Sequence, residues 1–354
     1  MNTKLQEILK VAIANKASDI HVAEGFVPKL RIKGQLVEIN NFSEESKSAL
    51  TEMILSTMSD DQKAKFKEER EWDYSLEFEN HRFRVNAYFQ QGKMALSLRV
   101  IPNEVPTFEE LGLPDIFKSF IYLKQGFILV TGPTSMGKST TVASVLNEIN
   151  KQRSCHIVTI EDPIEYVIKP QAAIISQREV GFDTHNFTQA LRSSLRQDPN
   201  VVFVGEMRDL ETISTALTVA ETGHLVFSTL HTNSAAQTID RIVDVFDQKE
   251  QIRVQLASVI TAIISQRLIQ TIDGTLAPAF EILLATPAVK NCIREGKTFM
   301  IDNIIQTSSD VGMVSLDYSL AKLVKMGLVT EEVAMTYSVK PNELQGNLRG
   351  IKNI

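Results

Sequence analysis

Residues 131–140 read Thr-Gly-Pro-Thr-Ser-Met-Gly-Lys-Ser-Thr and fit the phosphate-binding pattern Gly-x-x-x-x-Gly-Lys-Ser/Thr. The apolar run 127–130 precedes the pattern, and residues 141–149 carry apolar side chains at helical spacing. Strand, glycine-bounded loop and helix form the context in which this pattern binds phosphate, because loop amides and the helix N-terminus face the anion. The segment therefore predicts a nucleotide-binding α/β domain; an ordinary glycine-rich turn before a helix is the alternative.

The positions of this loop have separate expected roles. Backbone N–H groups would surround the phosphates of ATP, and Lys138 would reach the β- and γ-phosphates. The hydroxyl group of Ser139 would bind Mg²⁺. The predicted nucleotide-binding residues of the loop are Gly132, Pro133, Thr134, Ser135, Met136, Gly137, Lys138, Ser139 and Thr140.

Composition limits the class of protein. The chain has 354 residues, enough for two domains, and its net charge of −6 argues against direct binding to nucleic acid. Its two cysteines, Cys155 and Cys292, are far apart and predict neither a disulfide framework nor a zinc site. No apolar run approaches the ~18 residues of a membrane span, and the N-terminus lacks the apolar core of a signal peptide. We expect a cytoplasmic protein without a transmembrane segment.

The first hundred residues predict an α+β domain, residues 1–101, in which two strands carry arginines. Residues 82–87 and 94–100 alternate apolar and polar side chains and flank Gln91-Gly92, a hairpin turn signal. If the strands pair through that turn, Arg84 and Arg99 share a solvent-facing surface. This surface is either an ordinary solvated basic face or a pair of arginines offered to a phosphate on a neighbouring subunit.

Prolines mark the boundary that follows. Residues 102–115 contain Pro102, Pro106 and Pro114 and predict a stiff linker, so that the two domains move as hinged bodies. The predicted ATPase domain covers residues 116–340 and is largely helical from Asp240 onward. The polar tail, residues 341–354, is predicted to be flexible.

Two further apolar runs of the second domain end in acidic residues. The strand predicted at 155–160 leads into Glu161, Asp162 and Glu165, and carboxylates at the end of a parallel strand are costly unless they handle a metal or a proton. The alternative is an acidic turn before a helix.

The run 201–204 is followed by Gly205 and Glu206, the pattern of a Walker B element with Glu where Asp is more usual. Glu206 is the expected Mg²⁺ carboxylate, acting directly or through water. We expect Arg208 and Asp209 to form a local ion pair.

A fourth apolar run, residues 225–230, has His224 before it and His231 after it. Both histidines are candidates for sensing the γ-phosphate, although a lone histidine is more often structural. Four apolar runs separated by helical patterns predict a mostly parallel sheet with right-handed crossovers.

In combination these segments resemble the secretion-superfamily ATPases, and most closely the type IV pilus retraction ATPases. The resemblance extends from about Ser18 to Val339. Beyond the phosphate-binding loop, it is carried by residues 159–165, 204–212 and 220–235. Residues 288–295, Ala-Val-Lys-Asn-Cys-Ile-Arg-Glu, resemble a helix that is specific to retraction ATPases.

The resemblance implies a RecA-like core, a PAS-like N-terminal domain and a homohexameric ring that binds ATP between the two domains. It implies that Arg84 and Arg99 act on the nucleotide of a neighbouring subunit. It also implies that Glu165 is the catalytic base and Glu206 the Mg²⁺-site carboxylate. The implied function is retraction of type IV pili through an inner-membrane platform protein, with a paralogous retraction ATPase as a further candidate partner. The protein would then be cytoplasmic and peripheral at the inner membrane.

Four residues, at three places in the chain, depart from the family pattern. Ser135-Met136 stands where the family usually has Gly-Ser, so a side chain occupies a position that glycine leaves conformationally free. Lys33 replaces a frequent Asp, and Lys290 replaces Arg with loss of the guanidinium geometry. The remaining alternatives are an accessory retraction ATPase, a pilus-assembly or type II secretion ATPase, a nucleotide-dependent scaffold and a DNA translocase. The acidic charge balance argues against the last.

Overall fold

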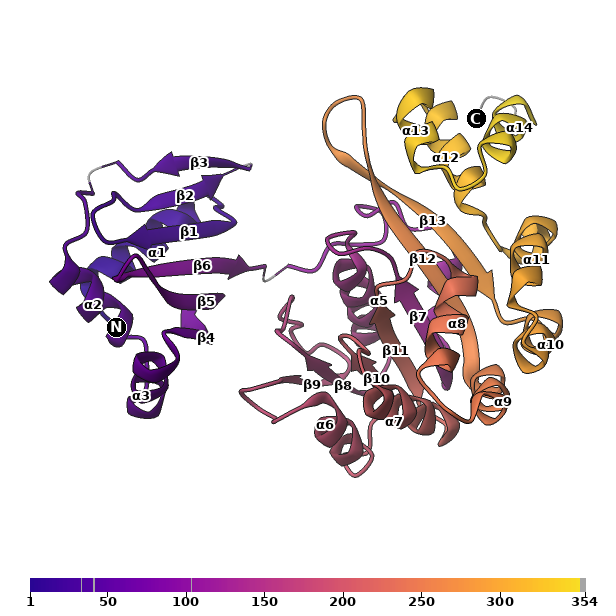
Figure 1. The fold of residues 1–354 in the computed structure, drawn as a ribbon, viewed down its shortest axis with the longest axis horizontal. Helices are drawn as coiled ribbons and strands as arrows, with labels where there is room; N and C mark the ends of the chain where they lie inside the picture. The colour runs from indigo at the N-terminus through magenta and orange to yellow at the C-terminus, as the bar shows by residue number, and fades with distance from the viewer. Residues whose placement is uncertain (33, 41, 103, 351–354) are drawn as a thin grey trace. The chain divides into compact units, whose positions relative to one another are not determined.

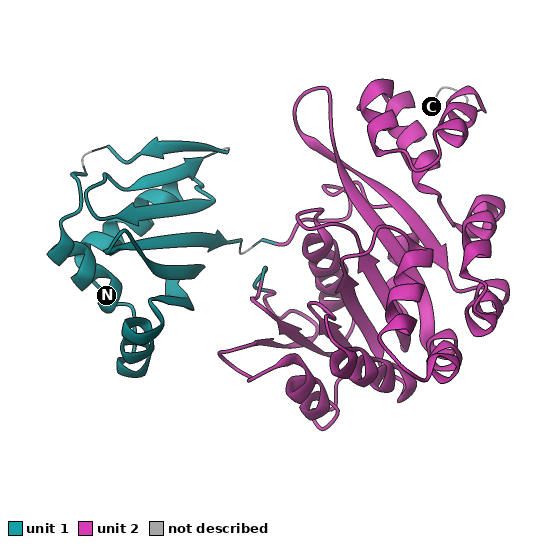
Figure 2. Cartoon of the chain, viewed as in Figure 1, with its two compact units in different colours: residues 1–104, 165–167 teal, residues 105–164, 168–354 magenta. Residues whose placement is uncertain are grey.

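The computed structural model describes the whole chain except residues 33, 41, 103 and 351–354 (Figure 1). The chain divides into two compact units (Figure 2). Unit 1 comprises residues 1–104 and 165–167, and unit 2 comprises residues 105–164 and 168–354. Lys33, one of the departures from the family pattern, lies outside the described residues. Within the described residues, no helix combines the length and apolarity needed to cross a bilayer.

Unit 1 is an antiparallel six-stranded sheet packed against helices, with the strand order β3-β2-β1-β6-β5-β4. Its helix α1 turns one face to the sheet, because Leu5, Ile8, Leu9 and Ala12 recur at helical spacing and are all buried. The elements are α1 (Thr3–Ala14), β1 (Asp19–Ala23), β2 (Lys29–Ile32), β3 (Gln35–Glu38), α2 (Lys47–Leu55), α3 (Asp60–Glu69), β4 (Glu71–Phe78), β5 (His81–Gln90) and β6 (Lys93–Ile101). The α+β prediction is confirmed, whereas the PAS-like assignment stays a prediction.

Unit 2 is built on a seven-stranded sheet with the order β13-β12-β7-β11-β10-β8-β9. Its strands are parallel except for β13, which pairs antiparallel with β12. The strands are β7 (Gly126–Thr131), β8 (His156–Glu161), β9 (Ile174–Glu179), β10 (Val201–Val204), β11 (Leu225–Leu230), β12 (Ile260–Gln270) and β13 (Leu276–Leu284). The prediction of a mostly parallel sheet is confirmed.

Helices cover both faces of this sheet, as Figure 1 shows. Successive residues of β7 point to opposite faces, so Phe127 and Leu129 enter one apolar core while Ile128 and Val130 enter the other. The helices are α4 (Ile116–Phe120), α5 (Lys138–Gln152), α6 (Phe187–Ser194), α7 (Leu210–Glu221), α8 (Ala235–Asp244), α9 (Lys249–Val259), α10 (Pro287–Glu295), α11 (Ile301–Thr307), α12 (Leu316–Lys325), α13 (Glu331–Tyr337) and α14 (Pro341–Gly350). Helices α4 and α5 pack on one face, and α6 to α10 pack on the other.

The expectation of a largely helical chain after Asp240 is wrong in one place. Strands β12 and β13 form a long antiparallel hairpin that completes the sheet next to β7. Helix α9 ends at Val259 and β12 begins at Ile260, so no turn residue separates helix from strand. A short apolar run of this kind has no periodicity that distinguishes a buried helix from a buried strand.

Two boundary predictions also need correction. Much of the predicted linker belongs to unit 2, where Phe108 is buried against Phe117 and Ser144 donates a hydrogen bond of 2.7 Å to the carbonyl of Pro106. The predicted flexible tail is helix α14 as far as Gly350, because Leu344 is fully buried in a small core shared with α12. Residues 351–354 lie outside the described residues.

Candidate nucleotide-binding site

The phosphate-binding loop connects β7 to α5, as predicted. Helix α5 begins at Lys138, whose ammonium group donates hydrogen bonds to the carbonyls of Gly132 at 2.8 Å and Pro133 at 2.9 Å. The residue is only 7% exposed. Burial lowers the pKa of the Lys138 ammonium, and the charge of Glu206 partly offsets this effect. The loop thus holds a desolvated cation at its centre, ready to exchange carbonyl partners for phosphate oxygens.

A carboxylate stands beside this cation at the end of β10. Burial alone would raise the pKa of Glu206, but the hydrogen bond and charge of Arg208, together with His231, outweigh it and hold the pKa below its usual value. The Glu206 carboxylate pairs with Arg208 at 2.8 Å and with Nε2 of His231 at 3.1 Å. The expected Arg208–Asp209 pair is wrong, because Asp209 caps α7 by accepting from the N–H of Thr212.

His231 links the carboxylate to the loop. Its Nδ1 lies 3.4 Å from the Lys138 ammonium and 3.3 Å from the hydroxyl of Thr134. An ammonium can only donate, so Nδ1 accepts, and the neutral ring then carries its proton on Nε2 and donates to Glu206. Lys138, His231, Glu206 and Arg208 therefore form one continuous polar chain across the ends of β7, β10 and β11.

The structure does not bring His224 to this chain. His224 precedes β11 and His231 follows it, so about seven residues of extended backbone, roughly 20 Å, separate them. The Nδ1 of His224 instead lies 3.0 Å from both the Thr222 hydroxyl and the Val219 carbonyl, at the end of α7. Within unit 2, the prediction that His224 contacts nucleotide at this loop is therefore wrong.

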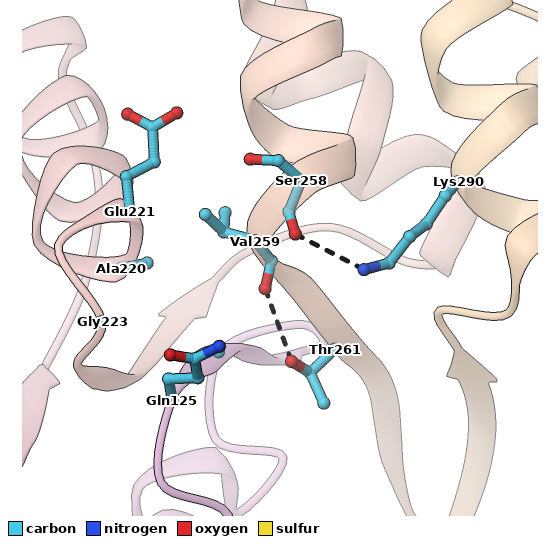
Figure 3. A pocket seen from close by; sticks show the side chains of 9 residues that line it. Gln125, Ala220, Glu221, Gly223, Ser258, Val259, Thr261 and Lys290 are labelled. Atoms are coloured by element: carbon cyan, nitrogen blue, oxygen red, sulfur yellow. Dashed lines mark hydrogen bonds between the residues drawn. The ribbon is translucent and has the colours of Figure 1, made fainter.

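A pocket of about 460 Å³ lies at that opposite end of the sheet (Figure 3). Gln125, Glu221 and Lys290 contribute polar side chains to it. The Lys290 ammonium approaches the Ser258 carbonyl at 3.4 Å, and the carboxylate of Glu221 accepts from Gln255 at 2.7 Å. Its polar groups come from separate helices and loops, and the phosphate-binding loop, residues 132–139, is not part of its lining.

The acidic segment after β8 divides between the two units. Glu161, in β8, is 6% exposed and accepts hydrogen bonds from Thr159 at 2.6 Å and Gln177 at 3.2 Å, which gives it a structural role. Glu165 lies in the short segment 165–167 that groups with unit 1 (Figure 2). Its assignment as the catalytic base stays a prediction.

Arg84 and Arg99 share an exposed face of unit 1, as predicted. They stand directly opposite each other in the β5–β6 register, and the intervening hairpin turns through Gln91 and Gly92, both with positive φ. The Nε of Arg99 donates to Asp19 at 2.9 Å, whereas the Arg84 side chain is exposed. Burial of Asp19 would raise its carboxyl pKa, but the hydrogen bonds from Arg99 and Ser18 and the charges of Arg99 and His21 together outweigh it, and the pKa is lowered. Action across a subunit interface stays a prediction.

A second pocket adjoins the phosphate-binding loop and was not predicted from the sequence. It encloses about 500 Å³ and is lined by Gly137 and Thr140 of the loop region together with Leu113, Leu268 and Leu276. A mostly apolar pocket beside the phosphate loop suits a nucleoside base. Two of these leucines belong to the β12–β13 hairpin. The sequence did not predict that hairpin, so it could not predict the pocket.

The fold and this loop define a P-loop nucleoside triphosphatase. A mostly parallel sheet with helices on both faces carries the glycine-bounded loop between β7 and α5, and the Glu206 carboxylate follows the buried strand β10, which β11 separates from β7. Residues 1–310 match the family described as Type II/IV secretion system protein, and the chain belongs to that family.

Similar proteins narrow the class further. The chain is 46% identical over 333 residues to the type IV pilus retraction ATPase PilT of Pseudomonas aeruginosa, covering 93% of this chain and 96% of the relative. It is 35% identical over 346 residues to the type IV pilus ATPase PilU of the same organism, covering 97% of this chain and 90% of the relative. A crystal structure of the pilus retraction motor PilT with bound ADP superimposes with a TM-score of 0.91 at 46% identity, covering 98% of this chain and 100% of that one. The chain is therefore an ATPase of the PilT type.

Proposed function

We propose that this chain hydrolyses ATP to retract type IV pili, and that it works as a homohexameric ring. The observation that carries the proposal is the chain from Lys138 through His231 to Glu206, which joins the phosphate loop to the end of β10. High identity to a pilus retraction ATPase over nearly the whole chain supports the choice of substrate and task.

On binding ATP, Lys138 would exchange the carbonyls of Gly132 and Pro133 for the β- and γ-phosphates. The loop amides from Gly132 to Thr140 would surround the phosphates, and the adjoining apolar pocket would receive the base. When Lys138 moves, Nδ1 of His231 would lose the Lys138 ammonium as a donor, and the ring would have to carry a proton on Nδ1 to donate to a γ-phosphate oxygen.

The donor set fits Mg²⁺. Among the described residues no group of three or more His, Cys, Asp and Glu side chains is placed to hold a metal, so the ion would rely on Ser139, Glu206 and the nucleotide itself. A hydroxyl and an ionised carboxylate are the hard oxygen donors that Mg²⁺ prefers, with waters completing its shell. When bound, the ion neutralises charge on the transferring phosphoryl group.

Hydrolysis needs groups from unit 1 as well. In the proposed ring, Glu165 orients the attacking water, and Arg84 and Arg99 of a neighbouring subunit stabilise negative charge on the γ-phosphoryl group. Arginines that act in trans are worth ~10³–10⁵ in rate in other phosphoryl-transfer enzymes. Opening and closing between the two units would then convert hydrolysis into movement.

The ring would act in the cytoplasm, held at the inner membrane by a platform protein of the pilus machine. Its movement would withdraw pilin subunits from the fibre base into the membrane. A paralogous ATPase similar to PilU is a second candidate partner.

The main test combines biochemistry with pilus length. Purified protein should release phosphate from ATP, and the Lys138→Ala variant should not; absence of release by the wild-type ring would favour a nucleotide-dependent scaffold. A strain lacking the chain should carry long fibres that do not retract. A strain without fibres would indicate an assembly ATPase instead.

Mixed rings test action across the interface. Neither Arg84→Ala nor Glu165→Ala protein should hydrolyse ATP alone. Mixing them should restore activity, because some interfaces then combine an intact arginine with an intact base. Arg99→Ala, mixed with Glu165→Ala, should behave in the same way. No recovery at any mixing ratio would contradict catalysis in trans.

A further inference from the structure

Strand β12 has a free edge beside the phosphate loop. Strand β7 ends at Thr131, which pairs with Ser265, whereas β12 continues to Gln270 along β13. From Gln266 onward, the edge of β12 that faced β7 therefore meets the residues that follow β7, which are the loop itself. Gln266 is the first of these β12 residues and is only 3% exposed.

The Gln266 side chain binds the loop from both ends of its amide. Its Nε2 donates to the carbonyl of Met136 at 2.8 Å, and its Oε1 accepts from the hydroxyl of Thr141 at 2.7 Å. Thr141 lies in the first turn of α5 and is itself 2% exposed. A buried amide with a donor bond and an acceptor bond is fixed in orientation.

Both glycines of the motif are pressed against the same residue. A Cβ on Gly132 would lie 2.3 Å from the Gln266 carbonyl oxygen, and a Cβ on Gly137 would lie 3.0 Å from Nε2 of Gln266. The neighbouring Leu268 N–H points to the sulfur of Met136 at 3.3 Å. The loop is therefore docked on β12 at several points, with Gln266 at the centre.

The bond to Met136 has a consequence for phosphate binding. A trans peptide plane points its carbonyl and the following N–H in opposite directions. Holding the Met136 carbonyl against β12 turns the N–H of Gly137 away from the strand, toward the concave side of the loop where phosphate is expected. We infer that Gln266 is a positioning residue of the nucleotide site, which pre-orients the loop amides for phosphate. This inference rests on the nucleotide site proposed above and adds a residue outside the motif to it.

The test compares two buried amides at the two ends of α5. Gln266→Met keeps an unbranched side chain of similar length and loses the hydrogen bonds to Met136 of the loop and to Thr141 of α5. Asn150→Leu is the matched control, because the fully buried Asn150 holds Lys169 and Gln171 at the far end of α5 with bonds of 2.8 and 2.9 Å. The measurements are the Kd for ADP by fluorescence titration and the Tm of each protein.

Gln266→Met should weaken ADP binding about tenfold. This is the change in Kd that corresponds to the net contribution of about one hydrogen bond, here one that orients the loop before ADP binds. KM for ATP should rise by a similar factor, with a smaller change in kcat. Asn150→Leu should lower the Tm but leave the Kd for ADP within about twofold of wild type. Wild-type affinity in Gln266→Met, or an equal loss of affinity in Asn150→Leu, would overturn the inference.

If Gln266→Met does not fold, Thr141→Val replaces it, since this change removes only the hydroxyl that anchors the amide. It should weaken ADP binding about threefold, and unchanged affinity would overturn the inference. Wild-type and Lys138→Ala proteins in the same titration separate the two hypotheses. If the wild type binds ADP and Lys138→Ala does not, the proposed nucleotide site is supported independently of the result for Gln266→Met.

Discussion

The two ends of β11 carry the same residue type in contrasting surroundings. At the carboxyl end, His231 joins a lysine, a threonine and a glutamate in one polar chain. At the amino end, His224 lies against the hydroxyl and carbonyl groups that end α7. A histidine at the carboxyl end of a parallel strand can therefore join the functional site, whereas one at the amino end contacts the end of a helix. The reason is that the loops at the carboxyl ends of parallel strands bring functional groups together.

The carboxyl and amino ends of the parallel strands (the two edges compared below) also differ in how much their residues destabilise the fold. The carboxyl edge holds a desolvated lysine, a half-buried glutamate and a serine with φ of 64° in the loop. The pocket at the opposite edge is lined by exposed polar side chains such as Glu221 (Figure 3). The desolvated charged groups gathered at the carboxyl end point to a site where function opposes stability.

The largest contrast is expected between two lysines, one at each edge. Lys138→Ala should reduce the rate of ATP hydrolysis by at least about a hundredfold, because the loop loses the cation that meets the phosphates. Lys290→Ala should leave the rate within about twofold, since its ammonium makes only a long contact with the Ser258 carbonyl among the bonds described. Steady-state phosphate release measures both. Equal losses in the two variants would break the distinction between the edges.

A buried carboxyl group predicts the next largest effect. Burial raises the pKa of Glu281 to about 7, although its carboxylate accepts from the N–H of Ala235 at 2.6 Å, where α8 begins after the His231 segment. Asp302 raises the pKa further, whereas Arg267 and Lys340 lower it. The protonated form is therefore the one that the fold favours.

The sign of the pH effect follows from this direction. A carboxyl group with a raised pKa stabilises the fold below its unfolded pKa of about 4.5, and that stability is lost as the pH rises through about 7. Glu281→Gln should remove a decline on the order of 3 kcal/mol from the free energy of unfolding between pH 4.5 and 8. Denaturant titrations across this range measure it, with the exposed Glu221→Gln as control. A variant that keeps the wild-type pH dependence would assign the decline to another group.

The histidines give the third test. His231→Ala should slow hydrolysis about tenfold, because Glu206 loses its Nε2 donor and Lys138 a neighbour. His224→Ala should cost about 1 kcal/mol in the free energy of unfolding, from the lost hydrogen bond at the end of α7, without slowing hydrolysis. Paired rate and denaturation measurements check both variants. A strong loss of hydrolysis in His224→Ala would mean that His224 acts at a site the single chain does not contain.

The sequence predicted the loop, the parallel strands and the carboxylate of β10, because each is a local pattern of apolar runs and motif residues. It did not separate His224 from His231, since only the strand direction shows which end of β11 meets the loop. The sequence predicted an ion pair between Arg208 and Asp209 because they are adjacent. Side chains of adjacent residues project in different directions, and Asp209 instead caps α7.

Tertiary pairing accounts for the larger omission. The β12–β13 hairpin has no turn signal at its entry from α9, and its role depends on lying beside β7. Gln266 and the base pocket depend on that neighbour, so no local pattern could identify them. The same limit applies to α14, which is ordered because Leu344 and Leu348 pack into a core shared with α12.

The smallest test concerns the unusual loop residue itself. Ser135 adopts φ of 64°, a left-handed conformation that glycine adopts freely and that costs other residues about 1 kcal/mol or more. Ser135→Gly should therefore raise the free energy of unfolding by up to about 1 kcal/mol, less the greater chain entropy that glycine gives the unfolded state. Asp198→Gly is the matched control, because Asp198 has φ of 52° in the turn before β10, away from the loop. Both variants should change stability by similar small amounts, measured by denaturant unfolding. Only Ser135→Gly should also change the Kd for ADP, because only that residue shares backbone with the phosphate-binding amides. An equal change of affinity in Asp198→Gly would show that strain at the two edges is not separable, and that the loop responds to global stability.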